Sequence, residues 1–188
     1  MLTTLLIYGM IENKFGGVLM LRLRPYKASD AKYIVKWITD ERLHAMWSAN
    51  KLPYPLTKEA LKEYQMNYEK DDRGWIFTAV DEKGAPVGHL LMSKADYEQE
   101  SIHFGFIVVD PTIRKKGYGR EMLKLAIKYV FEIMNMKKIT LGVFGNNQAA
   151  HNCYKAVGFV DETYEEKKFP YKEERWDYFG MAIYKQNE

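Results

Sequence analysis

The chain has 188 residues, of which 47% are apolar, 14% aromatic and 28% charged. This length fits one domain, because a second hydrophobic core would need roughly 100 further residues, and the apolar content excludes an intrinsically disordered chain. The 28 Lys and Arg residues exceed the 25 Asp and Glu residues by three, an excess too small to indicate a nucleic-acid-binding protein.

Two further features bear on the compartment in which the protein works. The single cysteine, Cys153, has no partner for a disulfide within the chain, which is typical of reducing compartments. The sequence contains no run of about 18 apolar residues that would span a membrane. Its first residues lack the basic start and the small-residue cleavage site of a secretory signal. We therefore expect a cytoplasmic protein.

The first part of the chain is predicted to form a strand, two helices and a hairpin. Alternating apolar and polar residues indicate the strand, and apolar residues at helical spacing indicate the helices. The turn sequence Asp81-Glu82-Lys83-Gly84 indicates the hairpin. In chain order these elements are a strand over 19–25, a helix capped by Ser29 or Asp30 and running to Ile38, a proline-rich loop over 52–55, a helix from Thr57 to about Lys70, and strands over 74–80 and 86–92.

The second part of the chain adds four strands and two helices. The apolar, β-branched run over 102–109 is typical of a central strand. A long apolar stripe, from Met122 to Met134, indicates the clearest helix. The predicted elements are a strand over 102–109, a helix from Gly117, a strand over 138–144, a short helix over 147–157, a strand starting at 158–159 and a last strand over 176–184. This order predicts an α/β fold with one mixed sheet.

Residues 1–19 do not fit this plan. The residues just before Met20, including Gly16 and Gly17, are compatible with codons of a ribosome-binding sequence upstream of a start codon. We therefore predict that the natural chain starts at Met20, so that residues 20–188 form the domain. The alternative is that residues 1–19 are a genuine extra strand or an arm between subunits.

The stretch from Val108 to Arg120 reads V-V-D-P-T-I-R-K-K-G-Y-G-R, which predicts a strand end, a basic glycine loop and a helix start. Unpaired N–H groups at a helix N-terminus bind phosphate, and the basic side chains add positive charge. A Walker loop is absent, and a Rossmann fingerprint would need glycine where Met122 stands. The loop therefore predicts a site for another phosphorylated ligand.

A second motif follows at 141–159, which reads L-G-V-F-G-N-N-Q-A-A-H-N-C-Y-K-A-V-G-F. Together with R-x-x-G-x-G at 114–119, it resembles the GNAT superfamily of N-acetyltransferases from about Met20 to the C-terminus. The resemblance implies a twisted mixed sheet with a splay between its two middle strands and helices on both faces. It also implies acetyl-CoA as co-substrate, no metal, and direct transfer of acetyl to a primary amine.

The resemblance also implies a role for individual residues. The basic loop would hold the CoA diphosphate, and the pantetheine arm would pair with the end of the central strand. Asn147 would bond near this arm, and Tyr154 would protonate the departing thiolate. The implied CoA-binding residues are Ile107, Val108, Val109, Arg114, Lys115, Lys116, Gly117, Tyr118, Gly119, Arg120, Asn147 and Tyr154.

The general base is where the sequence departs from the family pattern. Protein N-terminal acetyltransferases of the ribosomal-alanine type have Glu in the L-x-V segment, where this chain has Gly142. His103, two residues before Gly105, is the first candidate base, since histidine accepts protons near pH 7. Glu100 acting through water is the second. A third possibility is that the amine arrives already neutral.

Simpler explanations and other functions stay open. Tyr154 and the aromatic residues near Trp47 would also suit a core, Asn147 a helix cap and Cys153 a small packed residue. The chain would alternatively be an inactive acyl-CoA sensor, an interpretation that the missing carboxylate at Gly142 supports. The acceptor is left open among a peptide N-terminus, a polyamine, an aminoglycoside and an amino acid. We expect no nucleic-acid or membrane partner, and a homodimer through the last strands is possible. The loop over 47–56 and the segment over 162–175 are expected to shape the acceptor pocket, with the charged residues 165–168 and 172–175 in solvated loops.

Overall fold

The computed structural model describes residues 7–12 and 18–186 of the chain. Its strands form one eight-stranded sheet in the order β1-β2-β3-β4-β5-β6-β8-β7. Neighbouring strands are antiparallel except for the parallel pair β5–β6. The strands are β1 (Ile7–Glu12), β2 (Val18–Pro25), β3 (Trp75–Val80), β4 (Pro86–Asp96), β5 (Ser101–Val109), β6 (Lys138–Phe144), β7 (Val160–Tyr171) and β8 (Glu174–Tyr184).

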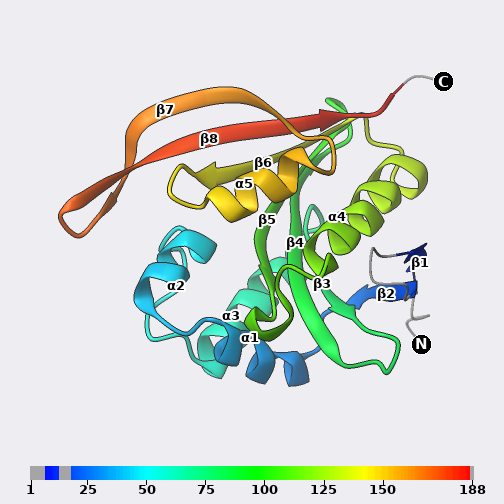
Figure 1. The fold of residues 1–188 in the computed structure, drawn as a ribbon, viewed down its shortest axis with the longest axis horizontal. Coiled ribbons are helices and arrows are strands. Elements are labelled where there is room, and N and C mark those ends of the chain that lie inside the picture. Colours follow the sequence, from blue (N-terminus) through cyan, green and yellow to red (C-terminus); the bar gives the residue numbers. More distant parts are fainter. Residues whose placement is uncertain (1–6, 13–17, 187–188) are drawn as a thin grey trace.

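Helices cover both faces of this sheet (Figure 1). The helices α4 and α5 pack on one face, and α1, α2 and α3 lie on the other. The predicted mixed sheet with helices on both faces is therefore confirmed. The helices are α1 (Ala31–Trp37), α2 (Glu41–Ser48), α3 (Lys58–Glu69), α4 (Tyr118–Lys128), which continues as a π-helical turn over Tyr129–Ile133, and α5 (Gln148–Lys155).

Apolar clusters form on both faces of the sheet because side chains alternate along the strands, one under α4 and α5 and two on the face of α1, α2 and α3. In β6, Ile139, Leu141 and Val143 join the core under α4 and α5, while Phe144 belongs to a smaller cluster on the opposite face with Ala45 of α2. Successive strand residues point to opposite faces. Therefore Thr140, Gly142 and Phe144 face the side of the sheet on which α2 lies.

Asp30 has a different task from the predicted cap. Its carboxylate accepts hydrogen bonds from Arg24 Nη1 and Nη2 (2.7 and 2.8 Å), the Lys27 N–H (3.0 Å) and the Thr78 hydroxyl (2.8 Å). It makes no side-chain cap to α1. Asp30 thus ties the end of β2 to β3 and to the turn before α1, where it is 3% exposed.

Two segments differ from the sequence-based expectation. Helix α2 was not predicted, although Asp40 caps it by accepting a hydrogen bond from the Leu43 N–H at 2.8 Å. The charged stretch 165–168, expected in a solvated loop, lies instead within β7, which pairs with β8 as a long hairpin that projects from the body (Figure 1). Almost all of β7 is exposed, so its sequence lacks the alternation by which half-buried strands are recognised.

The N-terminal strand β1 pairs with β2 at one edge of the sheet. The predicted start at Met20 concerns residues 1–19, of which residues 1–6 and 13–17 lie outside the described residues. That start stays a prediction. No described helix has the length and apolar character needed to cross a membrane.

Candidate active site

The two middle strands separate halfway along their length. β5 and β6 pair from Ser101–Lys138 to Phe104–Leu141, and no pairing between them is found beyond this point in the described chain. On its other side β5 stays paired with β4, with an irregularity at Phe106, which has φ of +49°. Such bulges bend a strand. The β6-facing edge of residues 105–109 is therefore left with free backbone N–H and C=O groups.

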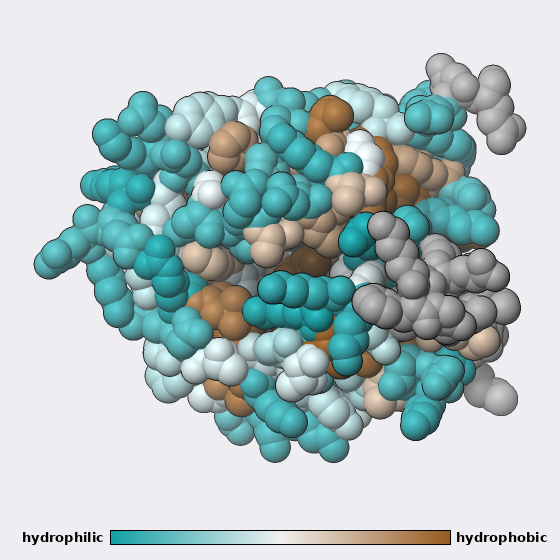
Figure 2. All heavy atoms as spheres, in the orientation of Figure 1, coloured by the Kyte–Doolittle hydropathy of each residue, from teal (hydrophilic) through white to brown (hydrophobic). Residues whose placement is uncertain are grey.

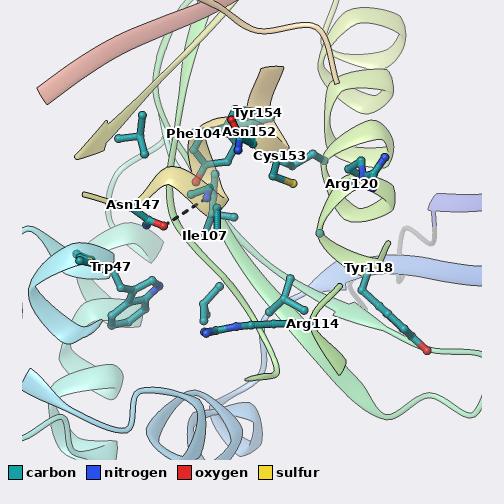
Figure 3. Close-up of a pocket in the computed structure, with 18 of the residues that line it drawn as sticks. Trp47, Phe104, Ile107, Arg114, Tyr118, Arg120, Asn147, Asn152, Cys153 and Tyr154 are labelled. Carbon is teal, nitrogen blue, oxygen red and sulfur yellow. Dashed lines mark hydrogen bonds between the residues drawn. The ribbon is translucent and has the colours of Figure 1, made fainter. Parts of the chain in front are cut away.

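A cavity of about 760 Å³ occupies this opening. Figure 2 shows an apolar hollow near the middle of the viewed face, and Figure 3 shows side chains from α2, β5, α4 and α5 around it. Among the predicted CoA-binding residues, all except Lys116 line the cavity. The cavity also has an end at α2, on the other face of the sheet. The residues at that end are Leu43, Met46 and Trp47 of α2, together with Phe106 and Phe144.

The N-terminus of α4 lies at the basic end of the cavity. Gly117 precedes the helix with φ of +93°, a conformation that favours glycine. The first bond of the helix runs from the Glu121 N–H to the Gly117 carbonyl at 3.1 Å, so the N–H groups of the three preceding residues have no partner within the helix. With Arg114, Lys115 and Arg120 around them, these N–H groups form a site suited to a phosphate-bearing ligand.

Gly119 keeps this site open. A Cβ atom added to it would lie 3.5 Å from Cys153 Sγ and 3.7 Å from Val109 Cγ2. The helix therefore approaches α5 and the end of β5 closely at this point, and a longer side chain at position 119 would extend into the cavity. Burial raises the pKa of the Cys153 thiol despite the nearby Arg120, so the thiol stays protonated and is no activated nucleophile.

Tyr154 lines the cavity from α5 although only 7% of it is exposed. Its ring packs edge-on against Phe159, which also contacts Phe104, the last residue of β5 to pair with β6. Burial, with a smaller contribution from Cys153, raises the pKa of the Tyr154 phenol well above its usual value. Tyr154 is therefore a protonated hydroxyl at the start of the splay, as a proton donor must be.

Asn147 both caps a helix and lines the cavity. Its Oδ1 accepts a hydrogen bond from the Ala150 N–H at 3.3 Å, at the start of α5 (Figure 3). Because this bond uses the side-chain oxygen, the amide NH2 group remains available as a donor. The structure thus supports the helix-cap interpretation of Asn147 and leaves its role toward CoA a prediction.

Neither candidate base lies among the residues that line the cavity in the described chain. Glu100 precedes β5 at the end remote from the splay and forms an ion pair with Lys137, so its role as base stays a prediction. His103 is closer: its Cδ2 would lie 4.0 Å from a Cβ added to Gly105, and its Nδ1 bonds Thr140 Oγ1 at 2.9 Å. Burial and the nearby Lys94 and Lys51 lower the pKa of His103 to about 4, so the ring is neutral at pH 7.

Sequence reasoning expected Trp47 at the start of a loop beside the acceptor, and it did not single out Tyr178. Trp47 lines the cavity from a helix that was not predicted, with its ring edge-on to Phe106 at 5.1 Å between centroids. Its indole N–H is buried without a hydrogen-bond partner in the described chain. Tyr178 of β8 covers Gly142 on the same face. Its only sequence signal is its place in the last strand, which does not indicate that it reaches the middle of the sheet.

Comparison with known proteins identifies the family. Residues 31–159 match the model of the acetyltransferase (GNAT) family. The chain is 27% identical over 149 residues to spermidine N(1)-acetyltransferase of Vibrio cholerae, covering 79% of this chain and 84% of that protein. It is 25% identical over 153 residues to alpha/beta-tubulin-N-acetyltransferase 9 of Drosophila melanogaster, covering 74% of each.

Solved structures agree with the family match. The crystal structure of the Vibrio cholerae spermidine N-acetyltransferase in complex with CoA and spermine superimposes with a TM-score of 0.77 at 26% identity, covering 87% of this chain and 95% of that one. No group of three or more His, Cys, Asp or Glu side chains is placed to hold a metal ion among residues 7–12 and 18–186. The chain therefore belongs to the acetyltransferase (GNAT) family, as an enzyme that transfers acetyl from acetyl-CoA to an amine.

Proposed function

We propose that transfer occurs directly, in a ternary complex, from acetyl-CoA bound on the α4 side of the sheet to a primary amine that enters from the α2 side. The observation that carries this proposal is one cavity that connects both sides through the opening between β5 and β6. Because both substrates reach the same opening, no covalent enzyme intermediate is needed.

Each part of the cavity has a task in this reaction. The free N–H groups at the start of α4 and the side chains of Arg114 and Arg120 bind the diphosphate. The free edge of residues 105–109 pairs with the pantetheine arm and donates N–H groups toward the acetyl oxygen. Binding at this edge fixes the thioester beside Tyr154.

The bond changes follow from this placement. The neutral nitrogen of the amine attacks the acetyl carbon, a C–N bond forms, and the C–S bond breaks. Tyr154 gives its proton to the departing CoA thiolate and regains one from water. The proton that the nitrogen loses passes to water, and His103, neutral and next to Gly105, is the side chain we propose to assist it. The products are the N-acetyl amine and free CoA.

A polyamine is the first acceptor to test, because spermidine is named as the substrate of several relatives. Aromatic rings at the α2 end, Trp47 and Phe144 among them, are able to hold an ammonium group.

One observation favours the alternative of a sensor without activity. No Asp or Glu is found among the described residues that line the cavity, and a base of the usual kind is therefore missing at Gly142.

The deciding experiment measures acetyl-CoA-dependent release of free CoA thiol with spermidine, an alanine-terminated peptide, kanamycin and lysine. Release that depends on one amine and falls in Tyr154→Phe supports the enzyme and names the acceptor class. Tight binding of acetyl-CoA without release for any amine contradicts the proposal and supports the sensor.

We further propose a cytoplasmic protein that forms a homodimer through β7. This strand is an edge of the sheet, and the residues before Phe169 are all exposed, so its outer backbone groups are free to pair with a second copy. Light scattering after size-exclusion chromatography measures the mass in solution. A monomer mass at micromolar concentration would contradict the dimer.

A further inference from the structure

The space in front of Gly142 is filled by a side chain from another strand. A Cβ atom added to Gly142 would overlap the hydroxyl oxygen of Tyr178 and lie 2.5 and 2.7 Å from its Cε2 and Cζ atoms. Gly142 lines the cavity at the point where β6 has separated from β5. Tyr178 is not itself among the described residues that line the cavity, but its phenol lies over Gly142, which is, and it occupies the position that a side chain at 142 would otherwise take.

The glycine at 142 makes room for this phenol, whereas the glycine opposite it in β8 makes room for Thr163. Gly142 of β6 is paired with Gly180 of β8, and Tyr178 is paired with Phe144. A Cβ atom added to Gly180 would lie 3.8 Å from Tyr178 Cε1 and would overlap the Thr163 hydroxyl. The Tyr178 ring also contacts Phe144, with centroids 6.2 Å apart. The ring is thus held over the sheet by packing on both of its neighbours.

The hydroxyl of Tyr178 is free to bind a ligand. None of the hydrogen bonds within the described chain uses it, and it is not among the buried polar atoms that lack a partner. Burial, with Glu165 adding to the effect and Lys168 opposing it, raises the pKa of Tyr178. The group therefore remains a neutral hydroxyl at physiological pH, with an oxygen that accepts and a proton that donates.

Tyr178 and Tyr154 approach the splay from opposite faces of the sheet. Tyr154 belongs to the core under α4 and α5, whereas Tyr178 packs against the cluster of Phe144, Tyr171 and Trp176 next to α2. In the proposed reaction the thiolate leaves on the first side and the amine arrives on the second. We propose that the Tyr178 hydroxyl accepts a hydrogen bond from the acceptor amine and holds its nitrogen at the splay, facing the thioester.

This inference rests on the proposed function and adds to it the residue that contacts the acceptor. It also assigns a role to the phenol that stands in front of Gly142. A hydrogen bond from a neutral amine to a hydroxyl orients the nitrogen lone pair but removes no proton. Tyr178 thus acts on the position of the amine, and its effect is expected in the kinetic constants for the amine alone.

The test compares Tyr178→Phe with Tyr184→Phe, which removes a hydroxyl at the C-terminal end of β8, away from Gly142, where it bonds Glu162. With the fastest amine of the panel, we expect Tyr178→Phe to lower kcat/KM for the amine about tenfold, the order of one lost hydrogen bond. The Kd of acetyl-CoA, measured by calorimetry, should stay within about twofold of wild type. Tyr184→Phe should change neither constant.

A second variant reaches the same hydroxyl by another route. Gly142→Ala adds the Cβ atom that would overlap the phenol, so it should displace Tyr178 and cause the same amine-specific loss. In the double variant the two losses should not add, because both act on one contact.

The inference is overturned if wild type acetylates an amine and Tyr178→Phe keeps its full kcat/KM for it. It is also overturned if Tyr178→Phe weakens acetyl-CoA binding as much as it lowers kcat/KM, which would mark a structural effect. If the wild-type protein acetylates none of the amines in the panel, the proposed function is refuted, and this inference with it.

Discussion

Replacing Gly119 by glutamate is the sharpest test of the phosphate end of the cavity. The gap at Gly119 accepts a Cβ atom at ordinary contact distances, 3.5 Å from Cys153 Sγ and 3.7 Å from Val109 Cγ2. The helix should therefore still form, and replacing glycine within it should stabilise it by up to about 1 kcal/mol. The remaining atoms of the glutamate side chain would extend into the cavity, next to the free N–H groups of α4.

The expected loss follows from the charges. Two unit negative charges about 4 Å apart repel by roughly 4 kcal/mol at the effective dielectric constant of a protein surface, which corresponds to an affinity about 1000-fold lower. Calorimetry with CoA measures this loss. Lys116→Ala is the matched control, because it changes the net charge by the same amount at a residue that does not line the cavity. A Kd for Gly119→Glu within about tenfold of wild type, with Tm unchanged, would refute the phosphate site.

Three further outcomes are expected. Tyr154→Phe should lower kcat about 100-fold with little change in KM for acetyl-CoA, because a general acid contributes at least that much to the rate. Steady-state release of CoA thiol measures both constants. An equal kcat in the two proteins would remove the role assigned to Tyr154. Burial, Lys94 and Lys51 lower the pKa of His103 to about 4, so the ring does not titrate near pH 7. The value of kcat/KM for the amine should therefore rise with pH only because the amine itself loses its proton. An inflection near about pH 6.5 that disappears in His103→Gln would contradict this reasoning. Burial alone would raise the pKa of Asp30, but Arg24, the Lys27 N–H and the Thr78 hydroxyl lower this pKa overall. The ionised Asp30 therefore stabilises the fold fully above the pKa of the unfolded state, and this stabilisation is lost as the pH falls through the lower pKa of the folded state. Asp30→Ala should cost about 3–5 kcal/mol of unfolding free energy at pH 7 and reduce this acid sensitivity, as urea unfolding at several pH values would measure; an unchanged midpoint at pH 7 would contradict it.

Much of the α4 side of the site could be predicted from the sequence, because its signals are local. Gly117 and Gly119 lie within a few residues of the basic side chains and of the helix that they precede. The apolar stripe of that helix has a regular period, so the core under α4 was also predictable. Tyr154 was placed correctly on a short helix after β6, and its position in the cavity followed from the family motif.

The α2 side depended on contacts between distant parts of the chain. Helix α2 is only eight residues long and starts from an Asp40 cap, so its sequence carried little periodic signal. Glu100 lies only three residues before His103 in sequence. Because a strand advances about 3.3 Å per residue, Glu100 nevertheless lies next to the end of β5 that is far from the opening.

By itself, the sequence determined the order of most strands and helices, the helix start suited to phosphate and the position of Tyr154, because each depends on a pattern of neighbouring residues. Only the tertiary structure decided which side chain stands in front of Gly142. Tyr178 is 36 residues further along the chain, and it reaches that position because β8 pairs with β6 and Gly142 faces Gly180. The pairing of strands so far apart in sequence depends on the packing of the whole sheet, so no local sequence pattern predicts it.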